Sequence, residues 1–279
     1  MARRVAGGIA VLASLLTLSA TPAAAVEVNP LRVELTGKPG ETISASLTIT
    51  NHRPETVRIR AQAGAYRYSF SAHTRPPTDP SAQRLPSCES WIATQGQEWS
   101  LGPAAAGALE FTVTIPQDTE QSAAGEYVAA LLVDELPLST DTSAGAGQGA
   151  VTVVPRIAIP VYLFLEGRDT PQGRVTDFVA QSGSQAGVVR LILTLANDGR
   201  VHLRPTGTVL VTNDRGEIVQ RSALGRTIPI FPKFAEGIPI WVPPLSAGRY
   251  KAVATVELGG DQLLQRDVTF NVSADGRVT

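Results

Sequence analysis

The chain has 279 residues, a formal net charge of −1 at pH 7 and a pI of about 6.3. Nucleic-acid-binding surfaces need clustered cationic charge, so this balance argues against a phosphate-binding protein. The length that remains after the first 25 residues is enough for two ordinary domains.

Residues 1–25 are predicted to be an export signal rather than part of the fold. Arg3 and Arg4 precede an apolar run over 5–18, and small residues close the segment at 23–25. This order of charge, apolar core and small residues is typical of a secretory signal peptide, with cleavage after Ala25. A membrane anchor is the alternative, but the run is short and rich in Ala and Gly. We expect a secreted protein, in the periplasm or at the cell surface, without an integral membrane span after cleavage.

The rest of the chain alternates apolar and polar residues in short runs. The clearest runs are 43–49, 57–63 and 109–115 in the first half, and 191–195 and 250–258 in the second. Period-two alternation gives a strand one dry face and one wet face, as in half-buried antiparallel sheets. With the frequent turn residues between runs, it predicts an all-β fold of two consecutive immunoglobulin-like β-sandwich domains.

The predicted boundaries follow from interruptions in the apolar pattern. The turn-rich stretch 167–173 separates a first domain over 26–167 from a second over 168–273, and 274–279 is expected to be a frayed tail. Two phrases recur in order. A strand ending in Asn occurs at 47–51 and 193–197, and a strand opening with Gly-x-Tyr occurs at 125–130 and 248–253. Tyr127 and Tyr250 could form sandwich tyrosine corners, or could simply be residues that favour strands.

No motif for catalysis, metal binding or a cofactor is present. The three histidines, His52, His73 and His202, are isolated from one another, and Cys88 is the single cysteine. It could pair with another chain, or be a buried spare thiol. We therefore predict a protein that is not an enzyme and that holds no metal or cofactor. A hydrolase remains an alternative, because a triad is defined by geometry rather than by sequence.

The order of several short motifs resembles the N-terminal sandwich of PapD-like periplasmic proteins, which include the chaperones of the chaperone–usher pilus pathway. It also resembles the first domain of two-domain PapD-like bacterial cell-surface proteins. The resemblance covers about half of the chain that follows the signal. The motifs are 29–35, Pro39-Gly40-Glu41, Ser90-Trp91-Ile92, Leu101-Gly102-Pro103, Gly125-Glu126-Tyr127 and 156–162.

The resemblance implies how a partner would be held. In pilus chaperones two basic residues bind the C-terminal carboxylate of a subunit, and matching positions here are Arg32 and Arg156. The last strand of the first domain then pairs with the partner through alternate apolar residues. The residues on this strand would be Val151, Val153, Ile157, Ile159 and Val161.

Two departures from the family pattern concern the same strand. Tyr162-Leu163-Phe164-Leu165-Glu166 stands where the chaperones have an aromatic-Arg-Pro sequence. Pro155 and Pro160 each lack the N–H group that a pairing strand uses. The two arginines could also be ordinary charges on an outer face.

The resemblance favours a non-enzymatic binding or assembly protein that engages an exported subunit or cell-envelope component, by strand addition or through the interdomain cleft. The alternative is a cell-surface module that binds peptidoglycan or extracellular matrix. Trp91 and Trp99 could stack on sugars if they are exposed, although core packing is the more common fate of a sandwich tryptophan.

Overall fold

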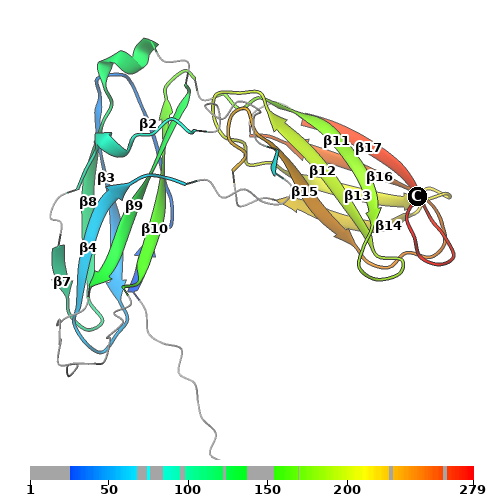
Figure 1. The fold of residues 1–279 in the computed structure, drawn as a ribbon, viewed down its shortest axis with the longest axis horizontal. Helices are drawn as coiled ribbons and strands as arrows, with labels where there is room; N and C mark the ends of the chain where they lie inside the picture. The colour runs from blue at the N-terminus through cyan, green and yellow to red at the C-terminus, as the bar shows by residue number, and fades with distance from the viewer. Residues whose placement is uncertain are drawn as a thin grey trace, which may run out of the picture.

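The structure, a computed structural model, describes residues 26–67, 74–75, 84–94, 98–121, 124–136, 154–168, 170–225, 229–259 and 263–279. They form two β-sandwiches, and Figure 1 shows the second leaving the first sideways near one end. The predicted fold class, two consecutive immunoglobulin-like sandwiches, is confirmed. The predicted export signal lies outside the described residues. Within them, no helix has the length and apolar character to cross a membrane.

The first sandwich packs a sheet of order β1-β3-β8-β6 against a sheet of order β2-β10-β9-β4-β7. β2 runs parallel to β10, and the other pairs are antiparallel. The predicted alternation places Leu47, Ile49, Leu109, Phe111 and Val113 inside, where they are at most 1% exposed. The strands are β1 (Val26–Asn29), β2 (Val33–Gly37), β3 (Thr42–Asn51), β4 (Val57–Gly64), β6 (Ile92–Thr94), β7 (Glu98–Leu101), β8 (Ala106–Thr114), β9 (Glu126–Leu136) and β10 (Arg156–Leu165), with the 3-10 helices η2 (Glu89–Trp91) and η3 (Gln117–Gln121).

The second sandwich packs a sheet of order β11-β12-β15-β5 against a sheet of order β14-β13-β16-β17. Its core contains Leu191, Leu193 and Leu195 from one sheet and Ala252 and Ala254 from the other. The short strand β5 comes from the first half of the chain, between β4 and β6. The bounds are β5 (Thr74–Arg75), β11 (Gly173–Ser182), β12 (Val189–Asn197), β13 (Thr206–Asn213), β14 (Ile218–Gly225), β15 (Ala235–Val242), β16 (Gly248–Glu257) and β17 (Leu263–Val272).

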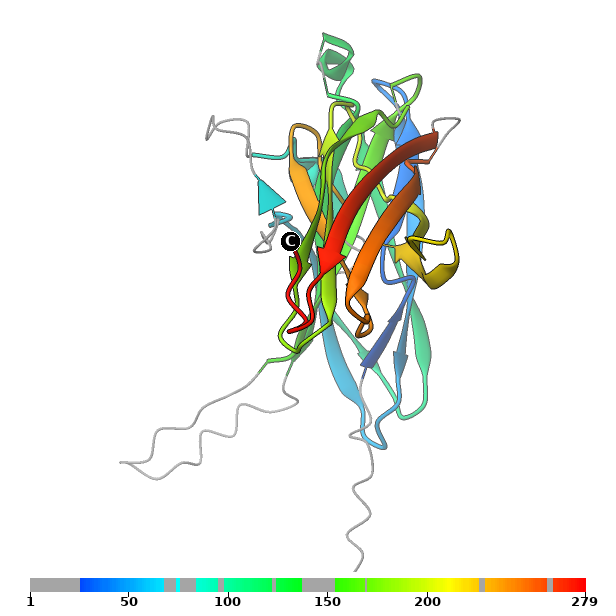
Figure 2. The same cartoon turned by 90° about the vertical axis from the view of Figure 1, so that its right-hand side faces the viewer.

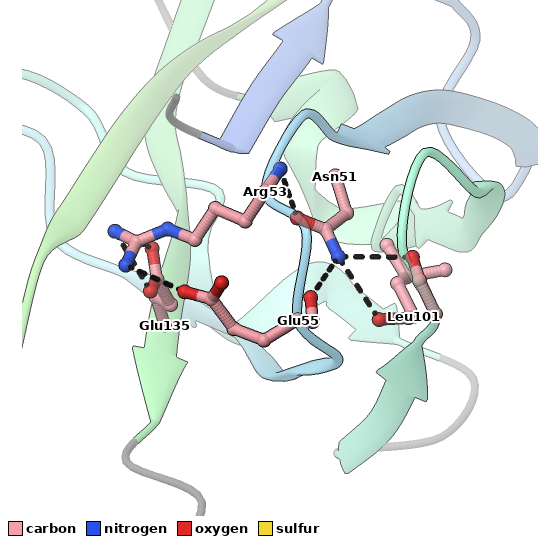
Figure 3. Close-up of polar contacts among 6 residues, drawn as sticks. Asn51, Arg53, Glu55, Leu101 and Glu135 are labelled. Carbon is pink, nitrogen blue, oxygen red and sulfur yellow. Dashed lines mark hydrogen bonds and ion pairs between the residues drawn. The ribbon is translucent and has the colours of Figure 1, made fainter. Parts of the chain in front are cut away.

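The Asn that ends β3 organises a corner of the first sandwich (Figure 3). The Nδ2 group of Asn51 donates hydrogen bonds to the carbonyl oxygens of Glu55, Leu101 and Gly102, at 2.8, 3.2 and 2.9 Å. Its Oδ1 accepts from the backbone N–H of Arg53 at 2.9 Å. Because Asn51 is fully buried, these bonds satisfy its own amide and the three backbone carbonyl oxygens around it without water.

The same device recurs in the second sandwich, where the same phrase occurs in the sequence. Nδ2 of Asn197 donates to Val201 O at 2.8 Å and Ile230 O at 2.7 Å. The hydroxyl of Tyr250 donates to Ser246 O at 2.9 Å, which is the tyrosine-corner arrangement. Tyr127 instead packs its ring against Trp91, with ring centroids 4.4 Å apart.

Residues 274–279, which the sequence pattern placed outside both domains, turn back onto β17. Asn271 and Thr279 exchange backbone hydrogen bonds of 2.8 and 3.0 Å. Val278 N also donates to Ser182 Oγ of β11 at 2.9 Å. The turn therefore joins β17 and β11, which are edge strands of the two sheets of the second sandwich.

Candidate functional site: the outer face of the first domain and the interdomain junction

The two sandwiches meet through a dry junction. The outer face of the first domain is the side of its β2-β10-β9-β4-β7 sheet that is turned away from its own core. Tyr162 of β10 and Val128 of β9 project from this face, and both belong to the hydrophobic cluster of the second sandwich. Phe164 and Tyr66 pack against the same cluster. The junction is thus continuous with the second domain's core.

A buried contact between a carboxyl group and an imidazole crosses the junction. Glu126, at the start of β9, accepts a hydrogen bond from the backbone N–H of His202 at its Oε2, 2.6 Å away. Its Oε1 lies 2.6 Å from Nδ1 of the same histidine. Both side chains are at most 4% exposed. The rings of Tyr162 and Phe231 lie 4.7 and 5.9 Å from the imidazole, so aromatic side chains exclude water from the pair.

Sequence reasoning missed this pair, because it treated His202 as an isolated residue. The motif 125–127 is conspicuous in the sequence only for its turn and its tyrosine. Nothing in the spacing of two residues 76 positions apart signals a contact. In the part of the chain that the structure describes, His52 and His202 each contact a carboxylate rather than a Ser or Thr hydroxyl. His73 lies outside the described residues.

A second polar contact links the domains beside β2. Nε of Arg32 lies 2.8 Å from Oε1 of Glu34, and Nε of Arg204, from the second domain, lies 3.8 Å from the same oxygen. The Arg204 guanidinium also lies over the ring of Tyr162, with Cζ 5.2 Å from its centroid. Arg32 is half exposed at this margin of the junction.

Arg156 lies on the same outer face but farther from the junction. Its Nε and Nη2 donate to Asp134 at 2.5 and 2.9 Å, and Nη2 of Arg60 donates to the same carboxylate at 2.8 Å. The bonds from Arg156 and then from Arg60 lower the pKa of Asp134, whose side chain is fully buried. One carboxylate thus holds two guanidiniums, which leaves this end of the face with a net positive charge.

The structure does not bring Arg32 and Arg156 together. Val33 of β2 pairs with Val161 of β10, so Arg32 stands level with Pro160. Arg156 is four residues earlier on β10, which places it about 13 Å away along the strand at about 3.3 Å per residue. The basic residue that lies beside Arg156 is instead Arg60, which was not among the predicted anchor residues.

The face between the two arginines is largely apolar. Ala158 pairs with Leu132 of β9, and Pro160 pairs with Ala130. Gln62 of β4 completes the first of these rows beside Leu132. This strip has Arg156 and Arg60 at one end and Arg32 with the junction at the other.

The described residues that were predicted to pair with a partner strand do not lie on this apolar strip. Ile157, Ile159 and Val161 point inward from β10, and the last two are fully buried in the core of their own domain. Val151 and Val153 lie outside the described residues. The role of all five in pairing with a partner stays a prediction.

The edge of β10 opposite β9 is partly covered. β2 pairs with it from Val161 to Leu165. Among the described residues, no strand pairs with Arg156–Pro160 on that side. This half of the edge is therefore where a partner strand could add.

The backbone direction decides what this open edge offers. Glu135 N donates to Pro155 O, so the backbone polar groups of Pro155 point toward β9. Because these groups alternate along a strand, those of Arg156, Ala158 and Pro160 point toward the open edge. The N–H missing from Pro155 is on the covered side, whereas the one missing from Pro160 is on the open side. Arg156 and Ala158 alone supply backbone donors there.

Two other expectations concern metals and the thiol. In the described ranges, no group of three or more His, Cys, Asp or Glu side chains could hold a metal ion. Cys88 is a free thiol buried in the first core, and burial raises its pKa to about 12. A thiol in this environment is a poor nucleophile.

Comparison with known proteins gives structural likeness only. No protein-family model matches the chain, and no curated protein matches it. The chain is similar to solved structures of chaperones. They include the YadV chaperone, at 10% identity and a TM-score of 0.47, with 88% of this chain and 98% of that chain covered. A chain in the complex of the Salmonella enterica SafA pilin with the SafB chaperone matches at 12% identity and a TM-score of 0.43, covering 89% and 99%. The class 5 fimbriae chaperone CfaA matches at 12% identity and a TM-score of 0.41, covering 87% and 98%.

Proposed function

We propose that this chain is a non-enzymatic binding protein of the cell envelope, which acts in the periplasm or at the cell surface. Its partner is an exported protein that is held against the outer face of the first domain, beside the junction. The order of motifs that resembles PapD-like proteins supports this assignment. The chemistry of the outer face supports it independently.

The observation that carries the proposal is the apolar strip with a guanidinium at each end. Ala158 and Leu132 leave apolar surface for an extended segment of a partner. Arg32 is half exposed at one end and Arg156 is 49% exposed at the other. Arginine binds carboxylates through paired N–H groups, so either end could fix the terminal carboxylate of such a segment.

Binding on the face is favoured over long strand addition. The open half of the β10 edge provides backbone donors at Arg156 and Ala158, and Pro160 interrupts the series. A proline on an open edge is a common device against edge-to-edge pairing. Main-chain pairing would therefore be short, and side-chain contacts with the strip would provide most of the affinity.

The test uses synthetic peptides of alternating apolar residues, made with either a free C-terminal carboxylate or a C-terminal amide. Binding to the full chain is measured by isothermal titration calorimetry. We expect Arg32→Glu or Arg156→Gln to weaken binding of the free acid by at least about tenfold, since a charge-assisted pair is lost. Arg174→Glu is the matched control, because Arg174 is an exposed, ion-paired arginine on the second domain.

The amide form separates the two parts of the proposal. If the amide and the acid bind equally and neither arginine variant changes the affinity, the carboxylate anchor is wrong. If no apolar peptide binds at all, the outer face is not the binding site. Circular dichroism confirms that each variant is folded before binding is measured.

A second candidate function has one specific observation in its favour. Trp91 and Trp99 are only partly exposed and pack against the first core, whereas Trp241 of β15 is 55% exposed. The guanidinium of Arg190 lies over the Trp241 ring at 5.8 Å and is bonded to Gln181 at 2.7 Å. This row of planar groups fits a cell-surface module that binds a glycan polymer such as peptidoglycan.

Sedimentation with purified peptidoglycan tests this second candidate. Retention of the folded protein that is lost in Trp241→Ala, but kept in the control Trp99→Phe, would support it. Equal sedimentation of the two variants, or no retention of the wild type, would exclude a glycan site at Trp241.

A further inference from the structure

The two sandwiches repeat one strand plan, with two differences. The first is β2, which pairs with β10 and has no counterpart among the described strands of the second domain. The second concerns the strand beside β8 and its equivalent. The order β1-β3-β8-β6 of the first domain corresponds to β11-β12-β15-β5 of the second, and β10-β9-β4-β7 corresponds to β17-β16-β13-β14. In the first domain, the place beside β8 is taken by its own strand β6. In the second domain, the equivalent place beside β15 is taken by β5, which belongs to the first half of the chain (Figure 2).

Among the described residues, the second half supplies no strand of its own at this place. β14 ends at Gly225 and β15 begins at Ala235. Within the short connection, Ile230 pairs with Leu203 rather than with β15. The edge strand comes instead from the first half, because β5 pairs Arg75 with Ala235 and Thr74 with Glu236.

Side chains on either side of β5 extend the contact. We use the name clasp for the described residues between β4 and η2, which are 65–67, 74–75 and 84–88. The ring of Tyr66 meets Phe231 of the second domain edge-on, with centroids 5.7 Å apart, and lies 6.0 Å from Tyr162. Leu85 packs against the second core. Phe231 and Glu236, which the clasp contacts or pairs with, are at most 1% exposed.

We propose that the second sandwich is completed in cis by the clasp, so that it depends on the first domain for its folded stability. Tyr66 of the clasp and His202 both pack against the rings of Tyr162 and Phe231, so the clasp and the Glu126–His202 contact hold the second domain through one aromatic cluster. The angle between the domains is then set before any partner binds. This inference does not rest on the proposed binding function.

Native-state hydrogen exchange of the full chain, read by mass spectrometry, tests the proposal. Arg75→Pro removes a backbone N–H from the strand that pairs with Ala235 and restricts its backbone, whereas the control Arg75→Ala keeps the N–H. We expect Arg75→Pro to raise exchange rates in peptides from β12 and β15 by at least about tenfold. Peptides from β3 and β8 in the first domain should exchange as in the control.

A second pair of variants addresses the side-chain part of the clasp. Tyr66→Ala removes the ring that meets Phe231, and Tyr66→Phe retains it. The proposal expects the same selective increase in β12 and β15 for Tyr66→Ala and little change for Tyr66→Phe. Exchange that is unchanged in both disruptive variants, or that rises equally in both domains, would overturn it.

Discussion

Glu126 and His202, one from each sandwich, are bound to each other twice in the buried junction. Breaking a buried pair of this kind leaves polar groups that have lost both water and a partner. We expect Glu126→Ala to lower the free energy of unfolding by about 3–5 kcal/mol, measured by urea denaturation.

An almost identical pair at the surface provides the control. Nε2 of His52 lies 2.6 Å from Oε2 of Glu27, but these side chains are 50% and 62% exposed. Glu27→Ala should change stability by no more than about 1 kcal/mol. Equal losses for the two variants would mean that burial at the junction does not determine the effect.

The carboxylate shared by Arg156 and Arg60 should make the protein acid-sensitive. The folded pKa of Asp134 lies below its ordinary value of 3.8, so its stabilising contribution is complete above that value and is lost as pH falls through the folded pKa. Urea midpoints measured from pH 5 to pH 2 should fall more steeply for the wild type than for Asp134→Asn. Asp267→Asn, which alters an exposed carboxylate paired with Lys251, should retain the wild-type slope.

The buried thiol should be protected from alkylation in the folded state. Burial raises the pKa of Cys88 to about 12, so the native protein has far less thiolate at pH 8 than the unfolded chain. We expect iodoacetamide to label Cys88 on the order of a thousandfold more slowly in buffer than in urea. The control is Ala247→Cys in a Cys88→Ala background, because Ala247 is exposed and its new thiol should react at similar rates in both conditions. Native labelling of Cys88 at the rate of this control would contradict the buried placement.

The same raised pKa has a consequence at high pH. An acid whose folded pKa is raised contributes stability below its unfolded pKa and loses it as pH rises toward the folded value. Cys88→Ala should therefore flatten the decline of stability between about pH 9 and pH 12. The loss is read from urea midpoints across that window.

The Asn51 corner should depend on the amide rather than on the size of the side chain. Asn51→Asp keeps the shape but points a carboxylate at three carbonyl oxygens, so we expect a loss of about 3 kcal/mol or more. Asn197→Asp should have a comparable effect on the second domain. Asn271→Asp, at an exposed position of β17, should stay within about 0.5 kcal/mol, and thermal unfolding of the three variants distinguishes these outcomes.

The fold was predictable because its signal is local. Leu47 and Ile49 alternate with polar neighbours, and the structure buries them as expected. The recurring Asn is visible as a repeat in the sequence, although its hydrogen bonds to loop carbonyls become visible only in three dimensions. For the tyrosines, one copy forms the corner and the other packs on Trp91, because the sequence around Gly-x-Tyr does not determine which partner lies nearby.

The junction could not be predicted in the same way. Glu126 and His202 carry no shared pattern, and two residues such as Thr74-Arg75 are too short to show alternation. Arg156 was identified from a resemblance, but its partners Asp134 and Arg60 follow from the register of three strands. Contacts that depend on register between distant segments leave no periodic trace in the chain.

Proline also stands on the outer edge of β15, beyond the two residues that pair with β5. Asn197 N donates to Phe234 O, so the backbone polar groups of Phe234 point toward β12. By alternation along β15, the backbone of Pro239 points away from β12, just as that of Pro160 points away from β9. In each sandwich, a strand that added to this edge would therefore meet a proline nitrogen, which has no hydrogen to donate. At the high concentrations of a purified stock, the outer edges of β10 and β15 therefore offer a poor template for fibril growth.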